Sequence, residues 1–362
     1  MASGYTRRLF LTAGPAALAL VASDAGENFP SEAKRYPDAA TEFEVVRLTD
    51  PAHTSLLPPY YSRAVSKKSN FVLYLNDRTG ISQVYRMDLK TYESRALTKA
   101  AALISDSVSL SSDEHSFHFA DGKTVYSGSL SHPHERPVYE APEGFDLGAV
   151  SVAEDGTHAF VVECQPKLWR LRAFKLIGSG TVGVVESPDP ISAPIPRPRR
   201  AGMLYRRGSE LWLANYDGNQ NHRLRVAPGR TGPAMWSADG RTVLYLNIPD
   251  DPKRLHDIRE FDPDTNEDRA VADTSQYVHF GRNADGSVFV GASGSKASPY
   301  ILLLVRAVKR ELALCEHKAS DPARVAPVFA PNSQRIFFQS DRHGKWAIYT
   351  IKVERLVEET DS

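Results

Sequence analysis

Residues 195–208 hold five arginines and no acidic residue. The arginines are Arg197, Arg199, Arg200, Arg206 and Arg207. A guanidinium group binds a carboxylate or phosphate through paired hydrogen bonds, and two prolines stiffen the segment. The stretch therefore predicts a site for an anionic ligand. A solvated loop whose arginines pair with acids of neighbouring elements is the alternative.

A single histidine is the second candidate for chemistry. His279 lies in an apolar run that predicts the innermost strand of a repeated unit, where a side chain can reach a central channel. There a histidine can bind a metal or a substrate, or serve as a hydrogen-bonded structural residue. His132 and His134 have ligand-like spacing but fall in an outer hairpin, which favours a surface loop. His317 and Asp321 can approach His279 only if their segment bends over the channel.

Several classes of protein are excluded by what the sequence lacks. It has no Gly-x-Ser-x-Gly elbow, no phosphate-binding glycine loop and no His-Glu-x-x-His motif. Lys plus Arg and Asp plus Glu both number 44, so the net charge gives no reason to expect nucleic acid or an anionic membrane as partner. A propeller-gated serine peptidase is not expected.

The elements that must position these residues follow from a repeat. Seven times, a strand-forming run leads into a turn and out into a second apolar run, and the turns begin 40 to 47 residues apart. The turns are residues 66–70, 111–115, 153–157, 196–202, 237–241, 283–287 and 330–334. A period of this size in strand-rich sequence is typical of propeller blades. We predict an all-β, seven-bladed β-propeller.

The ring is expected to close through the two ends of the chain. The last blade supplies only three strands, so residues 43–48 are predicted to pair there as the missing outer strand. Such closure removes exposed sheet edges. The propeller then spans residues 43–353, preceded by a lead-in at 26–42 and followed by a tail at 354–362.

Residues 1–25 have the pattern of an export signal. Arg7 and Arg8 precede a short, weakly apolar, alanine-rich segment that ends in small residues near Ala25. This is the twin-arginine pattern, and it predicts a periplasmic or secreted protein. An amphipathic or buried N-terminal helix is the alternative. Cys164 and Cys315 fall in different blades, and we expect them to be free thiols rather than a disulfide.

Several short motifs resemble a known family. They are Arg47-Leu-Thr-Asp50, the Asp-Arg-x-Gly hairpins at 77–80 and 341–344, and the segments 329–334 and 338–345. Together they resemble the oligogalacturonate lyases, seven-bladed propellers that act on digalacturonate from pectin. The resemblance spans most of the mature chain and is most specific at its two ends. The hairpin repeat alone fits the Tol-system propellers equally well.

The resemblance implies a β-elimination. In the family a divalent metal, typically manganese, neutralises the uronate carboxylate while a base removes the neighbouring proton. The metal is held by three histidines and a glutamine, and His279 resembles the first histidine. Arg324, Val325 and Ala326 stand where other histidine ligands are expected, and Asp321 lies near the place of the glutamine.

The remaining roles implied by the resemblance fall on the arginines. Arg206 or Arg207 matches the catalytic base, whereas Pro233 stands where a substrate-binding histidine is expected. The other three arginines are assigned to substrate carboxylates: Arg197, Arg199 and Arg200. Two functions follow. The protein is an exported uronate lyase with an altered metal site, or a non-catalytic propeller that binds an oligosaccharide or a protein through the same channel.

Overall fold

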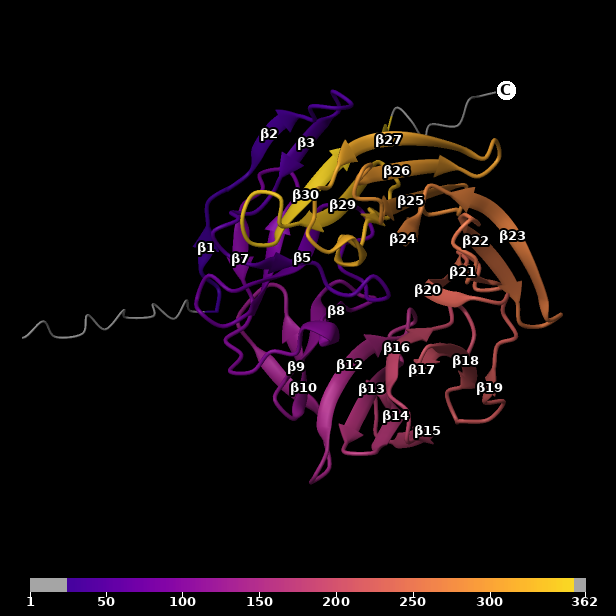
Figure 1. Ribbon diagram of the computed structural model, residues 1–362. Helices are drawn as coiled ribbons and strands as arrows, with labels where there is room; N and C mark the ends of the chain where they lie inside the picture. Colours follow the sequence, from indigo (N-terminus) through magenta and orange to yellow (C-terminus); the bar gives the residue numbers. More distant parts are fainter. Residues whose placement is uncertain (1–24, 355–362) are drawn as a thin grey trace, which may run out of the picture.

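A computed structural model describes residues 25–354, which form seven sheets arranged in a ring around a central channel (Figure 1). The predicted all-β, seven-bladed propeller is confirmed. The signal expected at residues 1–25 lies almost entirely outside the described residues. No helix in the described part of the chain is long and apolar enough to cross a membrane.

The strands of each blade follow one another from the channel outward. Blade one has β4 (Ser55–Leu56), β5 (Phe71–Asn76), β6 (Gln83–Asp88), β7 (Ser94–Ala96) and the added β1 (Asn28–Phe29). Blade two has β8 (Ser109–Leu110), β9 (Ser116–Asp121), β10 (Thr124–Ser129) and β11 (Glu135–Glu140). Blade three has β12 (Asp146–Val152), β13 (His158–Gln165), β14 (Leu168–Lys175) and β15 (Thr181–Ser187). Blade four has β16 (Ile191–Pro196), β17 (Gly202–Arg207), β18 (Glu210–Asn215) and β19 (His222–Arg223).

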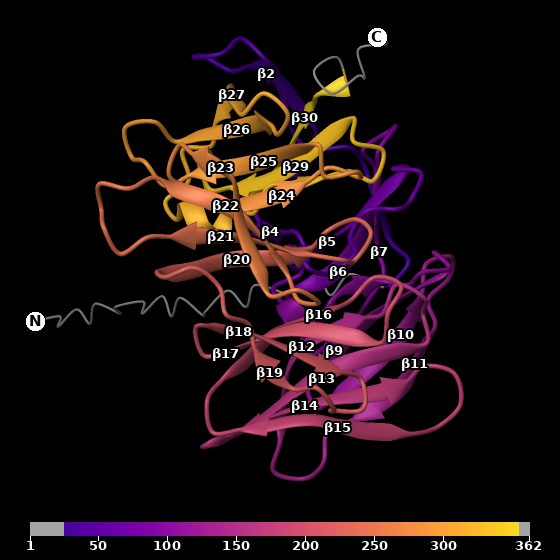
Figure 2. The same ribbon diagram turned by 90° about the vertical axis from the view of Figure 1, so that its right-hand side faces the viewer.

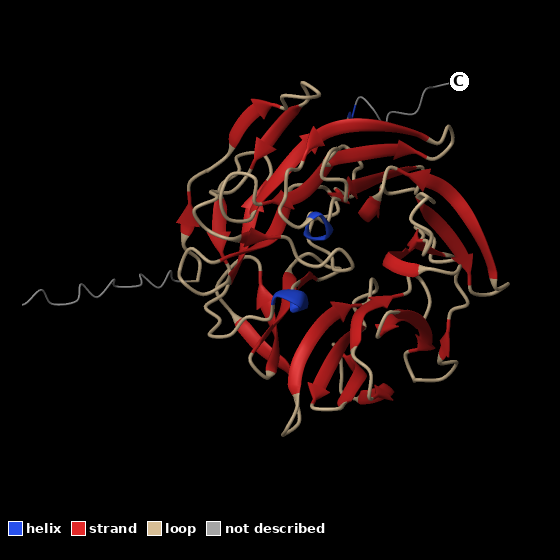
Figure 3. Cartoon of the chain, in the orientation of Figure 1, coloured by secondary structure: helices blue, strands red, loops and turns tan. Residues whose placement is uncertain are grey.

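The remaining blades follow the same order. Blade five has β20 (Arg230–Trp236), β21 (Val243–Ile248), β22 (His256–Asp262) and β23 (Glu267–Thr274). Blade six has β24 (Tyr277–Arg282), β25 (Val288–Ser293), β26 (Tyr300–Val305) and β27 (Arg310–Glu316). Blade seven has β28 (Val328–Phe329), β29 (Arg335–Ser340), β30 (Ala347–Lys352), β3 (Glu44–Arg47) and β2 (Lys34–Pro37). Two short 3-10 helices, η1 (Ser105–Ser107) and η2 (Pro322–Arg324), lie toward the middle of the ring (Figure 3).

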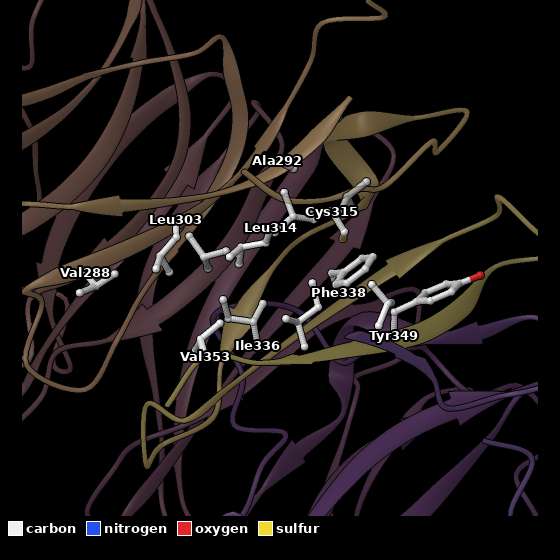
Figure 4. Close-up of a cluster of buried hydrophobic side chains, with 14 of the residues drawn as sticks. Val288, Ala292, Leu303, Leu314, Cys315, Ile336, Phe338, Tyr349 and Val353 are labelled. Atoms are coloured by element: carbon white, nitrogen blue, oxygen red, sulfur yellow. The ribbon is translucent and has the colours of Figure 1, made fainter. Parts of the chain in front are cut away.

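The core consists of apolar layers between neighbouring blades. Every residue of β5 is buried, as expected for a strand covered on both faces. Figure 2 shows the sheets of blades five and six side by side. In Figure 4, Leu303 and Leu314 of blade six face Ile336 and Phe338 of blade seven. Each sheet therefore buries its apolar side chains against the next, which is why the ring forms one domain.

The last blade is completed by the N-terminal strand, as predicted. β3 pairs with β30 in an antiparallel register that sets Val45 opposite Ile351. The segment that precedes β3 is fixed to blade six, because the Thr41 hydroxyl donates to the carbonyl of Leu314 at 2.6 Å. The carboxylate of Asp38, 1% exposed, accepts from the backbone N–H of Glu316 at 3.2 Å.

Cys164 and Cys315 are both free, which confirms the expectation of two thiols. Asp77 and Asp341 accept backbone N–H bonds from outside their hairpins, Asp77 from Thr54 at 2.7 Å and Asp341 from Ser320 at 2.9 Å. They therefore tie their hairpins to the adjacent connections.

The channel has two mouths, which we name by the inner strands. At the entry mouth the inner strands begin; at the turn mouth they end in the repeated turns. The inner strands of blades three to six each carry an irregularity near the entry mouth, and in blade six it lies between Tyr277 and His279. Such bulges redirect side chains and are common near functional sites. In blade one, residues 57–64 leave the sheet between β4 and an isolated bridge at Val65.

Candidate functional site

The five arginines do not form one cluster, because β17 separates them. Arg197, Arg199 and Arg200 lie in the turn before β17, and Arg206 and Arg207 end that strand. A six-residue strand spans roughly 17–20 Å, so the first three arginines belong to the turn mouth and the last two to the entry mouth. The predicted single cationic site is therefore two separate regions.

Arg197 connects blade four to blade five. Its Nε donates to the carbonyl of Gly240 at 2.7 Å, and its Nη2 donates to the carbonyl of Arg241 at 3.2 Å. The guanidinium also lies 4.7 Å from the ring centroid of Trp236. Only 8% of Arg197 is exposed. These contacts engage the side chain in blade packing rather than leaving it for the substrate carboxylate assigned to it from sequence.

The other arginines of the stretch are exposed or partly exposed. Arg199 is exposed, and Arg200 pairs with Asp264 at 3.1 Å. Arg207 pairs with Asp189 at 3.1 Å and lies 5.1 Å from the ring of Trp212. Neighbouring strand residues point to opposite faces of a sheet, so Arg207 points away from Arg206. The structure does not bring Arg199, Arg200 or Arg207 to His279.

Arg206 lies at the entry mouth, between blades four and five. Its Nη1 donates to the carbonyl of Thr231 at 3.3 Å, and its Nη2 donates to the carbonyl of Gly232. A third bond, to the carbonyl of Ser209, measures 3.4 Å. The guanidinium is thus held against the irregular part of the inner strand of blade five. Three carbonyl acceptors suit a charged group that donates hydrogen bonds, which is the state that binds a carboxylate.

Tyr60 connects Arg206 to His279. Its Oη accepts the backbone N–H of Ala234 at 3.4 Å, and it also accepts a bond from Arg206. Its ring meets the imidazole of His279 edge-on, with centroids 4.9 Å apart. Burial raises the pKa of Tyr60, while the Arg206 guanidinium opposes that shift, so the phenol stays protonated at neutral pH. Its own hydrogen has no acceptor among the described residues and is available to a ligand.

His279 is 5% exposed, and its Nδ1 has no hydrogen-bond partner within residues 25–354. Burial lowers the pKa of His279 to about 4, so its ring is neutral at pH 7. A buried polar atom without a partner lowers stability unless a ligand or water satisfies it. His279, Tyr60 and Arg206 therefore define the candidate site, which we call the entry-mouth site.

Sequence reasoning identified Arg206 and His279 but not Tyr60. A signal that could have pointed to it is the dipeptide Pro58-Pro59 before two tyrosines. Prolines cannot continue the hydrogen bonding of a strand, so they mark the point where the chain leaves the sheet and enters the channel.

The predicted metal ligands do not assemble. Asp321 is exposed and caps η2, where its side chain accepts the N–H of Ala323 at 3.1 Å. His317 uses both ring nitrogens: Nδ1 accepts the N–H of Ala319 at 3.1 Å, and Nε2 lies 2.9 Å from the carbonyl of Ser293. Residues 25–354 contain no group of three or more His, Cys, Asp or Glu side chains that could hold a metal ion. The residues present therefore do not fit the manganese site implied by the resemblance.

Two proteins of known activity are similar to this chain over most of its length. A scan against models of protein families gives no match. The oligogalacturonide lyase of Pectobacterium atrosepticum is 23% identical over 382 residues, which cover 91% of this chain and 98% of that protein. The oligogalacturonate lyase of Dickeya dadantii is 22% identical, and the alignment covers 88% of this chain and 95% of that protein. Over nearly its whole length, the chain is therefore similar to oligogalacturonate lyases.

A solved structure has the same fold as this chain. It is described as an oligogalacturonate lyase in complex with manganese, and it superposes with a TM-score of 0.85. Its chain is 23% identical to this one, and the superposition covers 91% of this chain and 98% of that chain. This chain therefore shares the propeller fold of that structure, and its described residues include a histidine on the inner strand of blade six but no group of residues that fits a metal.

Proposed function

We propose that this protein binds an acidic oligosaccharide of the uronate class at the entry-mouth site, without a metal. The observation that carries the proposal is the convergence of Arg206, Tyr60 and His279 on one end of the channel. A charged guanidinium, a phenol hydrogen and a neutral imidazole are the groups that bind a carboxylate and its neighbouring hydroxyls. The oligogalacturonide lyase relatives support the substrate class.

Each group has a defined task in this proposal. Arg206 is fixed by three backbone carbonyls and offers its remaining N–H groups to the carboxylate. Tyr60 donates its hydroxyl hydrogen to the same carboxylate or to a neighbouring hydroxyl. His279 supplies Nδ1 as the partner of a sugar hydroxyl, which satisfies the atom that is unpaired in the protein alone.

Titration calorimetry with digalacturonate in the presence of a chelator tests the proposal. Arg206→Met is expected to weaken binding about 10- to 100-fold, because hydrogen bonds to charged groups contribute about 1.5–3 kcal/mol. Arg200→Met, at the turn mouth, is the matched control and should bind as the parent does. Unchanged affinity in Arg206→Met would contradict the proposal, as would equal affinity for the methyl ester of digalacturonate.

Elimination at the same site is the second candidate, favoured by a neutral imidazole beside a fixed cation. A base would remove the proton from the carbon that bears the carboxylate, and the electrons of that C–H bond would form the new carbon–carbon double bond. The glycosidic C–O bond would break, and its oxygen would take up a proton. Ultraviolet absorbance of an unsaturated product, measured with and without manganese, tests for turnover. Product that disappears in His279→Ala supports elimination, whereas binding without product supports the binding function alone.

Export to the periplasm is part of the proposal. It rests on Arg7, Arg8 and the apolar segment that follows them. Replacement of both arginines by lysine should leave the full-length protein in the cytoplasmic fraction. Unchanged export of that variant would rule out the twin-arginine route.

A binding partner that is a protein rather than a sugar would show as co-purification insensitive to digalacturonate.

A further inference from the structure

The channel contains a cavity at the turn mouth that is separate from the entry-mouth site. It encloses about 360 Å³, which is within the size range of small-molecule sites. Five blades line it, through residues such as Pro59, Ile195, Met235, Phe280 and Phe329. Its walls are mainly apolar, which does not suit a uronate.

Residues 57–64 line this cavity, and Tyr60 among them also belongs to the entry-mouth site. Tyr60 lies in the wall of the cavity, whereas Arg206 and His279 do not line it. The hydroxyl of Tyr60 accepts bonds from Arg206 and Ala234, and neither of these residues lines the cavity. A ligand in the cavity would therefore touch the tyrosine without touching the other two residues of the entry-mouth site.

The polar groups of the cavity favour an anion. Its lining includes two arginines and no Asp or Glu; Arg63 is paired with Glu114, whereas Arg282 has no carboxylate partner among the described residues. Arg282 donates from Nε to the carbonyl of Trp236 at 2.9 Å and from Nη1 to two turn carbonyls at 3.0 and 3.1 Å, so its position is fixed and its Nη2 can bind a ligand. The hydroxyl of Ser62, also in the wall, is buried with no hydrogen-bond partner in the described part of the chain.

We infer that the turn-mouth cavity is a second binding site, for a compact aromatic or alicyclic molecule that carries one carboxylate or sulfonate group. The apolar walls hold the ring system. The anionic group lies against Arg282. This inference does not depend on whether the entry-mouth site binds uronates.

Fluorescence titration of the full chain with 1-anilinonaphthalene-8-sulfonate tests the inference. We expect saturable binding of one molecule per chain, at least 5-fold tighter than for uncharged N-phenyl-1-naphthylamine. Ala284→Trp places a bulky ring at the exposed rim of the cavity and should weaken sulfonate binding at least 10-fold. Ala52→Trp, at an exposed position outside the cavity, is the matched control and should bind as the parent does.

Three results would overturn the inference. They are unsaturable binding, equal affinity for the charged and uncharged probes, and equal affinity in the parent and Ala284→Trp. Thermal unfolding of both tryptophan variants checks that they are folded, so that lost binding reports on the cavity. Digalacturonate should not displace the probe, and displacement would show that the probe occupies the entry-mouth site instead.

Discussion

Arg197 and Arg206 come from the same short, basic stretch and end at opposite mouths of the channel. Arg197 donates to two backbone carbonyls of blade five and lies over Trp236, almost wholly buried. Arg206 also donates to carbonyls of blade five, but it meets Tyr60 and, through it, a histidine with an unpaired nitrogen. Two arginines with similar backbone partners therefore differ in what surrounds their remaining N–H groups.

The difference separates a stabilising role from a functional one. The Arg197 guanidinium is occupied by two backbone carbonyls and by the face of the Trp236 ring. Around Arg206, the fold leaves the Tyr60 hydrogen and the Nδ1 of His279 without partners among the described residues. Unsatisfied buried groups lower stability, and they persist at sites where a ligand satisfies them. We expect substitutions at the turn-mouth end of β17 to change stability and those at the entry-mouth end to change binding.

The largest effect is expected for the stability of Arg197→Met. The change leaves the carbonyls of Gly240 and Arg241 without their charged donor, so the free energy of unfolding should fall by about 2–4 kcal/mol. Urea unfolding measures it. Arg200→Met, which removes only an exposed pair with Asp264, should change stability by less than about 1 kcal/mol. Equal losses in the two variants would break the comparison.

The next largest effect is expected at the entry mouth, where His279 makes the free energy of unfolding depend on pH. The pKa of His279 is lowered by burial from 6.5 to about 4, so the unfolded chain binds a proton that the folded chain does not between these values. Stability therefore rises with pH across this window, and this histidine should lower it by up to about 3 kcal/mol as pH falls from 6.5 to 4. Unfolding of His279→Gln, measured at several pH values, should show a shallower slope. A slope equal to that of the parent would contradict the burial of a neutral imidazole.

The smallest effect is expected for Tyr60→Phe. The change removes one hydroxyl and keeps the ring against His279, so digalacturonate should bind about 3- to 10-fold more weakly while the fold is retained. Calorimetry measures the affinity, and thermal unfolding checks the fold. Parent-like affinity in Tyr60→Phe, together with weak binding in Arg206→Met, would restrict the site to the guanidinium.

The fold could be predicted because it repeats. Seven turns at a steady spacing identify blades, and a last blade with three strands requires a fourth from elsewhere, so the sequence predicts the strand at residues 43–48 that the structure has as β3. The added strands β1 and β2 were not predicted, because each extends a blade that already has its four strands. Local sequence gives little indication of such additions.

The site was only partly predictable. His279 was found because its place on an inner strand follows from the repeat. The five arginines were grouped by sequence distance, and β17 then separated them, because a strand carries neighbours in sequence far apart in space. Tyr60 was missed because it belongs to an insertion that crosses the channel, and the repeat cannot show where an insertion points.

The pairing of β3 with β30 has a consequence for how the chain folds. Val45 and Ile351 lie opposite each other although they are 306 positions apart in sequence, so the ring cannot close until nearly the whole chain exists. Contacts of such long sequence separation slow folding, because a large loop must be ordered before they form. Until then the edge of β30 is open, and the β2–β3 hairpin of another copy could pair with it in place of the chain's own. Pairing of β30 with the chain's own hairpin therefore competes with pairing to the hairpin of another copy, and a higher protein concentration favours the second.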